Sequence, residues 1–422
     1  MSAWNRRGFL EASFAGLSAA LFVGHGTGAG VFGAEEPKPV AAPVEGPDTL
    51  FLTWQDDPCT SVAIQWVGLE SAWGKEIELA LYDKDPWRTI PVRTRDYPNT
   101  DAKVFRCEVT GLTPDTEYRF RIGADGAVLR FRTMPAKATN TIQFVSGGDC
   151  GIGEHAINTN RIAAAQEPRF ALIGGDLAYD NGTSPKTFTQ FLRNYRAHMV
   201  DSKGRLIPMV SCIGNHEVTG AYGKPRSASP QYLSLFDGLF RDTTFGVLDI
   251  GDYLSLLLLD TGHIAPIDGE QTSWLERTLA ARQDRPHLIV ANHVPAYPSF
   301  RPAEVGEKQA GTGGLQRQHW SPLFERYRVD AVLEHHDHMF KRTHPLTGGL
   351  VDKNGVLYLG DGSWGKLRSP KGPEKRNYLA AVNSTYHMTV HRFDGEDRFH
   401  VALEETGKLA DVCHTHGKRP SR

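Results

Sequence analysis

The sequence contains few cysteines, and they are spread widely along the chain. Only five occur among 422 residues, at positions 59, 107, 150, 212 and 413. None of the spacings between them is the short interval of a thiolate zinc site, so a zinc-finger type of metal site is not expected. Cys59 and Cys107 fall in one stretch of predicted strands. They could form a disulfide after export, and the distance that decides this is not given by sequence.

The chain also lacks an excess of charge of either sign. It has 47 Lys and Arg residues against 49 Asp and Glu residues, for a formal net charge of -2. A chain that binds nucleic acid through its phosphates usually carries a basic excess, so no nucleic-acid partner is expected. The length of 422 residues is enough for two or three domains with a sizeable core.

A hydrophobic run long enough to cross a membrane is missing as well. The apolar segment Phe14–Val23 is shorter than the roughly 20 residues that a spanning helix requires. It follows the paired arginines of Asn5-Arg6-Arg7-Gly8-Phe9-Leu10, and together these features predict an export signal over residues 1–34. We interpret the signal as the twin-arginine type; an ordinary secretory signal and a retained anchor are the alternatives. We therefore expect an exported, periplasmic or secreted protein whose mature chain does not insert stably into a membrane.

The first folded part of the chain predicts a β-sandwich over residues 48–135, after a Pro-, Ala- and Glu-rich linker over residues 35–47. Short runs with period-two alternation, separated by turn residues, are typical of such a fold. Six of them occur, at Leu50–Trp54, Ser61–Val67, Ile77–Tyr82, Val104–Val109, Tyr118–Ile122 and Val128–Arg132. The segment Gly111–Tyr118 resembles the corner of a fibronectin type III domain, where a tyrosine hydroxyl ties two strands together. No residue of this part indicates catalysis.

From Thr141 onward, strands alternate with helices, which predicts an α/β domain over residues 140–405. Apolar residues at helical spacing predict four helices, at Asn158–Gln166, Ser184–His198, Gln271–Arg282 and Gln316–Tyr327. The segments Val218–Phe245 and Pro298–Gly314 are punctuated by glycine and proline and predict long loops over a cleft. Residues 406–422 are expected to form a tail.

Polar side chains follow the ends of five predicted strands. In an open α/β sheet, ligands bind beyond the carboxyl ends of the strands, so these side chains predict a site. They supply seven groups of the metal-ligand type: Asp149, Asp176, Tyr179, Asn215, His293, His336 and His338. One such residue alone would more often be a cap or a turn residue. Seven ligands are too many for one ion, and a carboxylate can bridge two, so the set predicts two metal ions bridged by Asp176.

These strand ends resemble the five ordered motifs of the purple acid phosphatases, a branch of the calcineurin-like metallophosphoesterase superfamily. The motifs are Gly148-Asp149-Cys150-Gly151, Gly175-Asp176-Leu177-Ala178-Tyr179, Gly214-Asn215-His216-Glu217, Asn292-His293 and His336-Asp337-His338. The resemblance implies a fibronectin-like β-sandwich followed by a two-sheet α/β metallophosphoesterase domain with helices on both outer faces. Gly151 stands where most of the superfamily has a histidine ligand, and the resemblance implies that Tyr179 replaces it.

The resemblance also implies the metals and the reaction. Fe(III) would be held by Asp149, Asp176, Tyr179 and His338, and a divalent Zn, Mn or Fe ion by Asp176, Asn215, His293 and His336. A phenolate is a hard anionic donor that suits ferric iron. The implied enzyme is a phosphoric ester hydrolase of the acid phosphatase type, in which a metal-bound hydroxide attacks a phosphomonoester and His216 acts at the phosphate or the leaving oxygen.

Two points stay open at the level of sequence. Many relatives have a second catalytic histidine some ten residues after the one that corresponds to His293, and none occurs here, so the general acid could be Arg301, Glu304 or His263. A phosphodiesterase with the same metals is an alternative function, and an adhesion module with a silent phosphatase domain is another. The pattern specifies neither the natural ester nor the oligomeric state.

Overall fold

The computed structural model describes residues 45–369 and 376–417, which fall within one compact unit, Pro43–Arg422. The predicted export signal over residues 1–34 and most of the predicted linker over residues 35–47 lie outside the described residues. Within the described ranges, no helix combines the length and the hydrophobicity needed to cross a bilayer.

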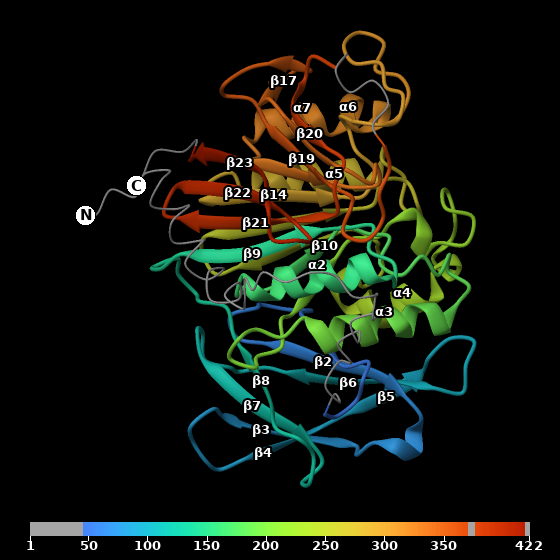
Figure 1. Ribbon diagram of the computed structural model, residues 1–422, viewed down its shortest axis with the longest axis vertical. Coiled ribbons are helices and arrows are strands. Elements are labelled where there is room, and N and C mark those ends of the chain that lie inside the picture. The colour runs from blue at the N-terminus through green and yellow to red at the C-terminus, as the bar shows by residue number, and fades with distance from the viewer. Residues whose placement is uncertain (1–44, 370–375, 418–422) are drawn as a thin grey trace, which may run out of the picture. The chain divides into compact units, whose positions relative to one another are not determined.

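The N-terminal domain is a sandwich of two four-stranded sheets, as predicted (Figure 1). In spatial order the first consists of β1 (Phe51–Thr53), β2 (Val62–Gly68), β6 (Lys103–Val109) and β5 (Arg93–Asp96), and the second of β4 (Arg88–Pro91), β3 (Glu76–Leu81), β7 (Glu117–Ile122) and β8 (Leu129–Arg132). Side chains from both sheets form one core, in which Trp66 stacks on Phe105 at 5.0 Å between ring centroids. The hydroxyl of Tyr118 accepts a hydrogen bond from the N–H of Thr113 at 2.9 Å, which confirms the predicted tyrosine corner.

Two strands of the sandwich were not predicted, and the two cysteines in it do not pair. β4 and β5 are mostly exposed, so they lack the alternation by which a strand is recognised. Cys59 and Cys107 are buried free thiols, and the Sγ of Cys59 donates a hydrogen bond to the carbonyl of Pro135 at 3.3 Å.

The C-terminal domain contains two larger sheets. One has the order β11 (Met209–Ser211), β10 (Ala171–Ile173), β9 (Ile142–Gly147), β21 (His387–Asp394), β22 (Asp397–Glu404) and β23 (Leu409–His416). The other has the order β12 (Gly246–Ile250), β13 (Leu254–Leu259), β14 (His287–Asn292), β15 (Ala331–Glu334), β19 (Leu357–Asp361), β16 (Phe340–Thr343) and β20 (Leu379–Asn383). A short hairpin of β17 (Leu346–Thr347) and β18 (Leu350–Val351) lies outside both. The strand β23 corrects the predicted tail over residues 406–422, because it pairs with β22 along its whole length.

Helices cover the outer faces of both sheets (Figure 1). The helices α2 (Glu154–Ala165) and α3 (Pro185–His198) pack together beside the six-stranded sheet, and α5 (Glu270–Ala280), α6 (Gly314–His319) and α7 (Ser321–Arg326) accompany the seven-stranded sheet. The helix α3 begins where the sequence indicates, because the Ser184 hydroxyl accepts a hydrogen bond from the N–H of Thr187 and Pro185 occupies the first turn. The predicted fold class, a β-sandwich followed by a two-sheet α/β domain, is confirmed.

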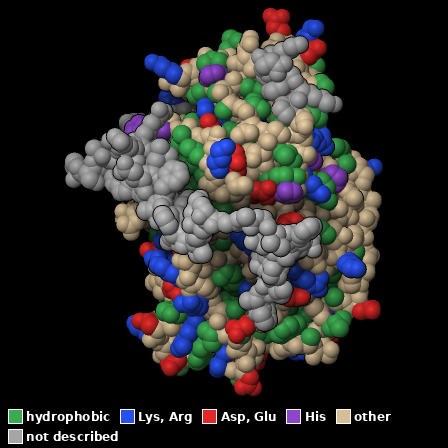
Figure 2. Space-filling view, in the orientation of Figure 1, with side chains coloured by type: hydrophobic (Ala, Val, Ile, Leu, Met, Phe, Trp, Pro, Cys, Tyr) green, Lys and Arg blue, Asp and Glu red, His purple; other side chains and the backbone are tan. Residues whose placement is uncertain are grey.

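Two predictions about helices were wrong. The segment Gln316–Tyr327 is not one helix, because it is interrupted at Trp320; the second piece begins at Ser321, with Pro322 in its first turn. The segment Val218–Phe245 is not a loop throughout, because it contains α4 (Pro230–Phe240). The described part of the chain also contains the single 3-10 turns η2 (Glu70–Ala72), η3 (Asn215–Glu217) and η4 (Arg226–Ala228). Figure 2 shows acidic and basic side chains interspersed over the coloured part of the visible face.

Candidate metal centre

The polar strand ends predicted from the sequence meet at one place. The strands β9, β10 and β11 are mutually parallel, and so are β14, β15 and β19, so the carboxyl ends within each set lie at one edge of their sheet. The turns after β9 and β10 carry Asp149 and Asp176, while those after β14 and β15 carry His293 and His336. Ligand atoms from the two sheets lie within 4.8 Å of one another in two groups, which share Asp176.

The first group joins Asp149, Tyr179 and His338 with Asp176. The Tyr179 hydroxyl lies 3.1 Å from Oδ1 of Asp149 and 2.9 Å from Nε2 of His338. Nε2 of His338 is 3.0 Å from the same oxygen of Asp149. The other oxygen of Asp149 accepts a hydrogen bond from the N–H of His336 at 2.8 Å, which ties the turn after β9 to the turn after β15.

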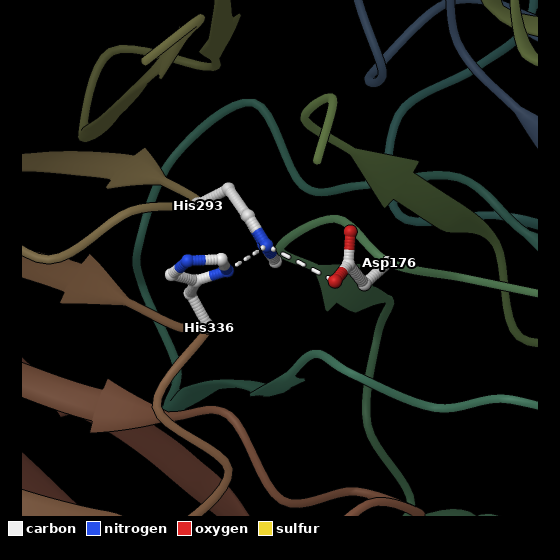
Figure 3. Close-up of side chains that lie close together, drawn as sticks. All are labelled: Asp176, His293 and His336. Carbon is white, nitrogen blue, oxygen red and sulfur yellow. Dashed lines mark hydrogen bonds and ion pairs between the residues drawn. The ribbon is translucent and has the colours of Figure 1, made fainter. Parts of the chain in front are cut away.

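The second group joins His293, His336 and Asn215 with Asp176, and Figure 3 shows three of these side chains pointing toward one another from different strand ends. Nε2 of His293 lies 3.3 Å from Oδ2 of Asp176, 3.0 Å from Nδ1 of His336 and 3.1 Å from Oδ1 of Asn215. Its Nδ1 donates a hydrogen bond to the carbonyl of Gly174 at 2.9 Å, which leaves Nε2 free to face the group.

The pKa values and the donor atoms of these side chains are compatible with a bound cation. Burial together with Asp149 and Asp176 raises the pKa of Tyr179 well above its usual value, and a cation bound among these oxygens reverses that effect. Burial by itself opposes ionisation of Asp176, but His293 outweighs it and the pKa of Asp176 is lowered. Correspondingly, Asp176 raises the pKa of His293 to about 9 against the effect of burial. Carboxylate, phenol, amide and imidazole donors suit iron, zinc and manganese ions, so the residues present fit the implied metals.

The backbone at the candidate ligands is strained. Asp149, Asp176, Tyr179, His336 and His338 all have left-handed conformations, with φ values of 58°, 54°, 61°, 73° and 60°. Such conformations are uncommon outside glycine and cluster at functional sites, where the surrounding structure enforces them. The sharp turns place the side chains beyond the strand ends rather than on either face of the sheets.

Glu217 holds the turn that carries Asp176. Its carboxylate accepts hydrogen bonds from the N–H groups of Asp176 at 2.8 Å, Leu177 at 2.7 Å and Gly214 at 2.8 Å. Burial and the neighbouring carboxylates raise the pKa of Glu217 to about 8. Gly214 must lack a side chain, because a Cβ there would lie 2.4 Å from Oδ1 of Asp176.

His216 lies beside the two groups but belongs to neither. Its ring centroid is 4.2 Å from that of Tyr179, and its Nε2 is 3.9 Å from Oδ2 of Asp176. Its Nδ1 donates to the side-chain oxygen of Asn181, so Nε2 remains available to a substrate. The side chain is 34% exposed, and burial lowers its pKa.

The three residues predicted as possible general acids have other partners. Arg301 donates hydrogen bonds to the carbonyl of His336 and to Oδ1 of Asp337, the latter at 2.7 Å, and so fixes the turn between the candidate ligands His336 and His338. His263 is fully buried, and burial lowers its pKa to about 4. Glu304 forms an exposed ion pair with Lys308 at 3.9 Å.

Two residues near the centre were not predicted. The Tyr222 hydroxyl lies 3.4 Å from Nε2 of His336, and it comes from the long segment before α4, which gave no motif. Lys366 comes five residues after the end of β19, and no sequence motif singled it out. The signal that could have found Lys366 was the one used for the other five strand ends.

Comparisons with known proteins match both domains. Residues 47–137 match the N-terminal domain of purple acid phosphatases, and residues 148–340 match the calcineurin-like phosphoesterases. An uncharacterized protein of Mycobacterium tuberculosis is 27% identical over 407 residues, covering 82% of this chain and 73% of that protein. Purple acid phosphatase 22 of Arabidopsis thaliana is 25% identical over 279 residues, covering 62% of this chain and 59% of that one. The structure of purple acid phosphatase PPD1 from yellow lupin (Lupinus luteus) seeds has a similar fold, with a TM-score of 0.70 at 16% identity, covering 88% of this chain and 74% of the lupin chain.

Proposed function

Because the chain belongs to the calcineurin-like phosphoesterases and carries the N-terminal domain of purple acid phosphatases before its catalytic domain, we propose that it hydrolyses phosphate monoesters at a centre of two metal ions. Phosphoric ester hydrolysis is the activity of this family. The observation that carries the proposal is the sharing of Asp176 by two groups of ligand atoms. A carboxylate that belongs to both groups is the arrangement that a bridged pair of ions requires.

Each ion would be held by residues from both sheets. Asp149, Asp176, Tyr179 and His338 would hold Fe(III), and Asp176, Asn215, His293 and His336 would hold a divalent Zn, Mn or Fe ion. When bound, such a pair supplies an activated water as nucleophile and neutralises the charge that develops on the phosphoryl oxygens.

His216 is the residue of this chain that would act directly on the substrate. Its backbone N–H donates to Oδ1 of Asp176 at 2.8 Å, so its position is fixed by the bridging residue itself. Because Asn181 engages Nδ1, the ring presents Nε2 toward the phosphate or the leaving oxygen. When the ring is protonated, that nitrogen would donate a hydrogen bond that stabilises the charge on the leaving group.

We also propose that the protein acts outside the cytoplasm, in the periplasm or as a secreted enzyme. The paired arginines and the short apolar run near the start support this proposal. Replacement of Arg6 and Arg7 by lysine should retain the protein in the cytoplasm, as measured by cell fractionation. Unchanged export would contradict the twin-arginine assignment.

The bridging role of Asp176 can be tested by metal content. Asp176→Asn keeps the size of the side chain but removes the charge that holds two cations together, so we expect fewer than two metal ions per chain by elemental analysis. Asp180→Asn is the matched control, because Asp180 is a buried carboxylate in the turn after the same strand and belongs to neither ligand group. Two metal ions per chain in Asp176→Asn would remove the bridging role.

The substrate class can be tested with the unmodified protein. Nitrophenyl phosphate and bis-nitrophenyl phosphate are assayed side by side, and we expect faster hydrolysis of the monoester. A preference for the diester would make the protein a phosphodiesterase with the same centre. Activity on neither ester, with both metals present, would overturn the proposed reaction and leave a binding function.

A further inference from the structure

A sixth strand also ends at the metal centre. The strand β19 runs parallel to β15, so its carboxyl end lies at the same edge as His336. The N–H of Trp364 donates to the carbonyl of Gly148, and that of Gly365 to the carbonyl of Asp149, which places the turn after β19 directly against the first motif. Lys366 is the next residue of that turn.

The stem of Lys366 fills the space that a side chain at position 151 would occupy. Gly151 has a φ of +67°, and a Cβ built on it would lie 2.9 Å from Cε of Lys366. The ammonium nitrogen lies 4.6 Å from the ring centroid of Tyr179, the same ring that His216 approaches. The absence of a side chain at position 151 therefore brings a cation to the ligand Tyr179.

No described side chain of residues 45–360, 362–369 and 376–417 forms an ion pair with the ammonium group of Lys366, whose printed contact is the ring of Tyr179. The two arginines nearby are engaged, since Arg301 pairs with Asp337 at 2.7 Å and Arg368 donates to Nδ1 of His338 at 3.2 Å. A partly buried ammonium group without an acceptor is unfavourable, and a bound anion would satisfy it. The anion that the neighbouring centre would bind is a phosphoryl group.

We propose that Lys366 binds a terminal phosphoryl oxygen of the substrate and thereby gives the centre a preference for phosphate monoesters over diesters. This inference rests on the proposed function. A monoester dianion presents one more charged terminal oxygen than a diester, whose corresponding oxygen carries an organic group. A cation beside the centre gains a charge-assisted hydrogen bond from the first substrate and none from the second. Lysine suits this task because its ammonium group is a compact charge on a flexible stem.

The test compares Lys366→Met, which keeps the stem and removes the charge, with Lys366→Arg, which keeps the charge. Lys353→Met serves as control, because Lys353 is exposed in the turn before β19, at the end of that strand away from the centre. For Lys366→Met we expect kcat/KM on nitrophenyl phosphate to fall about 10- to 100-fold, the size of one charge-assisted hydrogen bond. On bis-nitrophenyl phosphate we expect a change under about 3-fold, and Lys366→Arg should retain most of the monoester activity.

A second readout does not depend on turnover. The affinity of the metal-loaded protein for inorganic phosphate, measured by calorimetry, should fall by a similar factor in Lys366→Met and stay unchanged in Lys353→Met. Equal losses on both esters, or an unchanged phosphate affinity, would mean that Lys366 only packs on Tyr179, and would overturn the inference. If the unmodified protein hydrolyses neither ester but binds phosphate through Lys366, the proposed reaction fails and the anion site stands. If it neither hydrolyses these esters nor binds phosphate, both fail.

Discussion

Some residues at the centre would hold metal and others would face the substrate. A substitution of His216 tests this distinction. His216 takes part in neither ligand group, so His216→Ala should keep near-normal metal content. Turnover should fall by roughly 10²- to 10⁴-fold, as for the loss of an acid–base or electrostatic group. Elemental analysis and steady-state kinetics on the same preparation check both parts. A loss of metal would instead make His216 a ligand.

Tyr179 distinguishes an iron centre from one with zinc or manganese in both positions. A phenolate bound to Fe(III) absorbs visible light, so the oxidised protein should be purple or pink, and Tyr179→Phe should bleach it. Lys366→Met is compared with Tyr179→Phe, because it removes the positive charge next to the Tyr179 ring and leaves the phenol oxygen in place. A colourless, fully active protein without iron would contradict the ferric assignment and leave the two-metal proposal intact.

Among single residues, those of the site that directly follow a strand can be identified from the sequence more readily than those that packing brings to the site. Asp149, Asp176 and His293 could be identified because each follows an apolar strand, and parallel strands bring their ends together. Tyr222 has no such local signal, since its position depends on the path of a long segment. Lys366 follows a strand too, but its approach to Tyr179 depends on the absence of a side chain at Gly151. The structure brings the predicted residues together, and their roles as ligands remain predictions.

Among the elements, α4 shows why a real helix can escape a search for periodicity. Its residues Gln231–Phe236 are all buried, so no polar face alternates with an apolar one. The signal that remains is the pair Ser229-Pro230, a residue type common at helix starts followed by proline in the first turn. The many glycines and prolines of the surrounding segment favour a loop, and they outweighed this signal.

The helix α4 is also the element on which the sandwich rests. Asp237 on α4 accepts hydrogen bonds from Arg95 at 2.8 Å and from Arg106 at 2.6 Å. The side chain of Gln65 donates to the carbonyl of Leu235 at 3.1 Å, and the ring of Phe51 lies 5.6 Å from that of Phe236. Polar and apolar contacts of α4 are thus among those that join the two domains.

Asp237→Ala should therefore lower the free energy of unfolding by about 1–2 kcal/mol, since it removes partly exposed charge-assisted hydrogen bonds. Burial opposes ionisation of Asp237, but the two arginines outweigh it and its pKa is lowered. A lowered pKa means that the contribution is present above the usual carboxyl range and is lost as pH falls through the lowered value. Denaturant unfolding at neutral pH and near about pH 3 should show the difference shrinking in acid.

Asp242→Ala is the matched control for this change, because Asp242 is an exposed carboxylate just beyond the same helix. It should alter the free energy of unfolding by less than about 0.5 kcal/mol. Equal effects of the two substitutions, or an effect of Asp237→Ala that does not depend on pH, would mean that the contacts with Arg95 and Arg106 contribute nothing specific.

For the whole molecule, the sandwich supplies no candidate ligand but covers an apolar helix of the catalytic domain. A shortened chain beginning at Asn140 should still bind metal and hydrolyse small esters. It should unfold at a lower temperature and be less soluble, because Phe236 and its neighbours on α4 become exposed. Thermal unfolding, metal content and activity are compared with those of the full chain. A shortened chain that folds and binds metal but is inactive would show that the sandwich contributes to the chemistry.

The two-domain organisation could be predicted from a change in hydrophobic periodicity along the chain. The C-terminal boundary of the second domain could not. Alternation with period two gives way to strands and helices near Thr141, and this marks the boundary. The predicted end of the domain at residue 405 is too early, because β23 is recognised as a strand by its pairing with β22. A pairing between strands is a tertiary contact, and the local pattern of residues 409–416 does not contain it.

The left-handed backbone at the candidate ligands restricts how this chain can change over evolutionary time. Asn, Asp, His and Gly are the residue types that tolerate such a conformation best, and three of these four also bind metals. At Asp149, Asp176, His336 and His338, drift toward a hydrophobic or β-branched residue would break the turn as well as the site. A descendant that lost its metals while keeping its fold would therefore carry glycine or asparagine at these positions, and could regain activity by single substitutions.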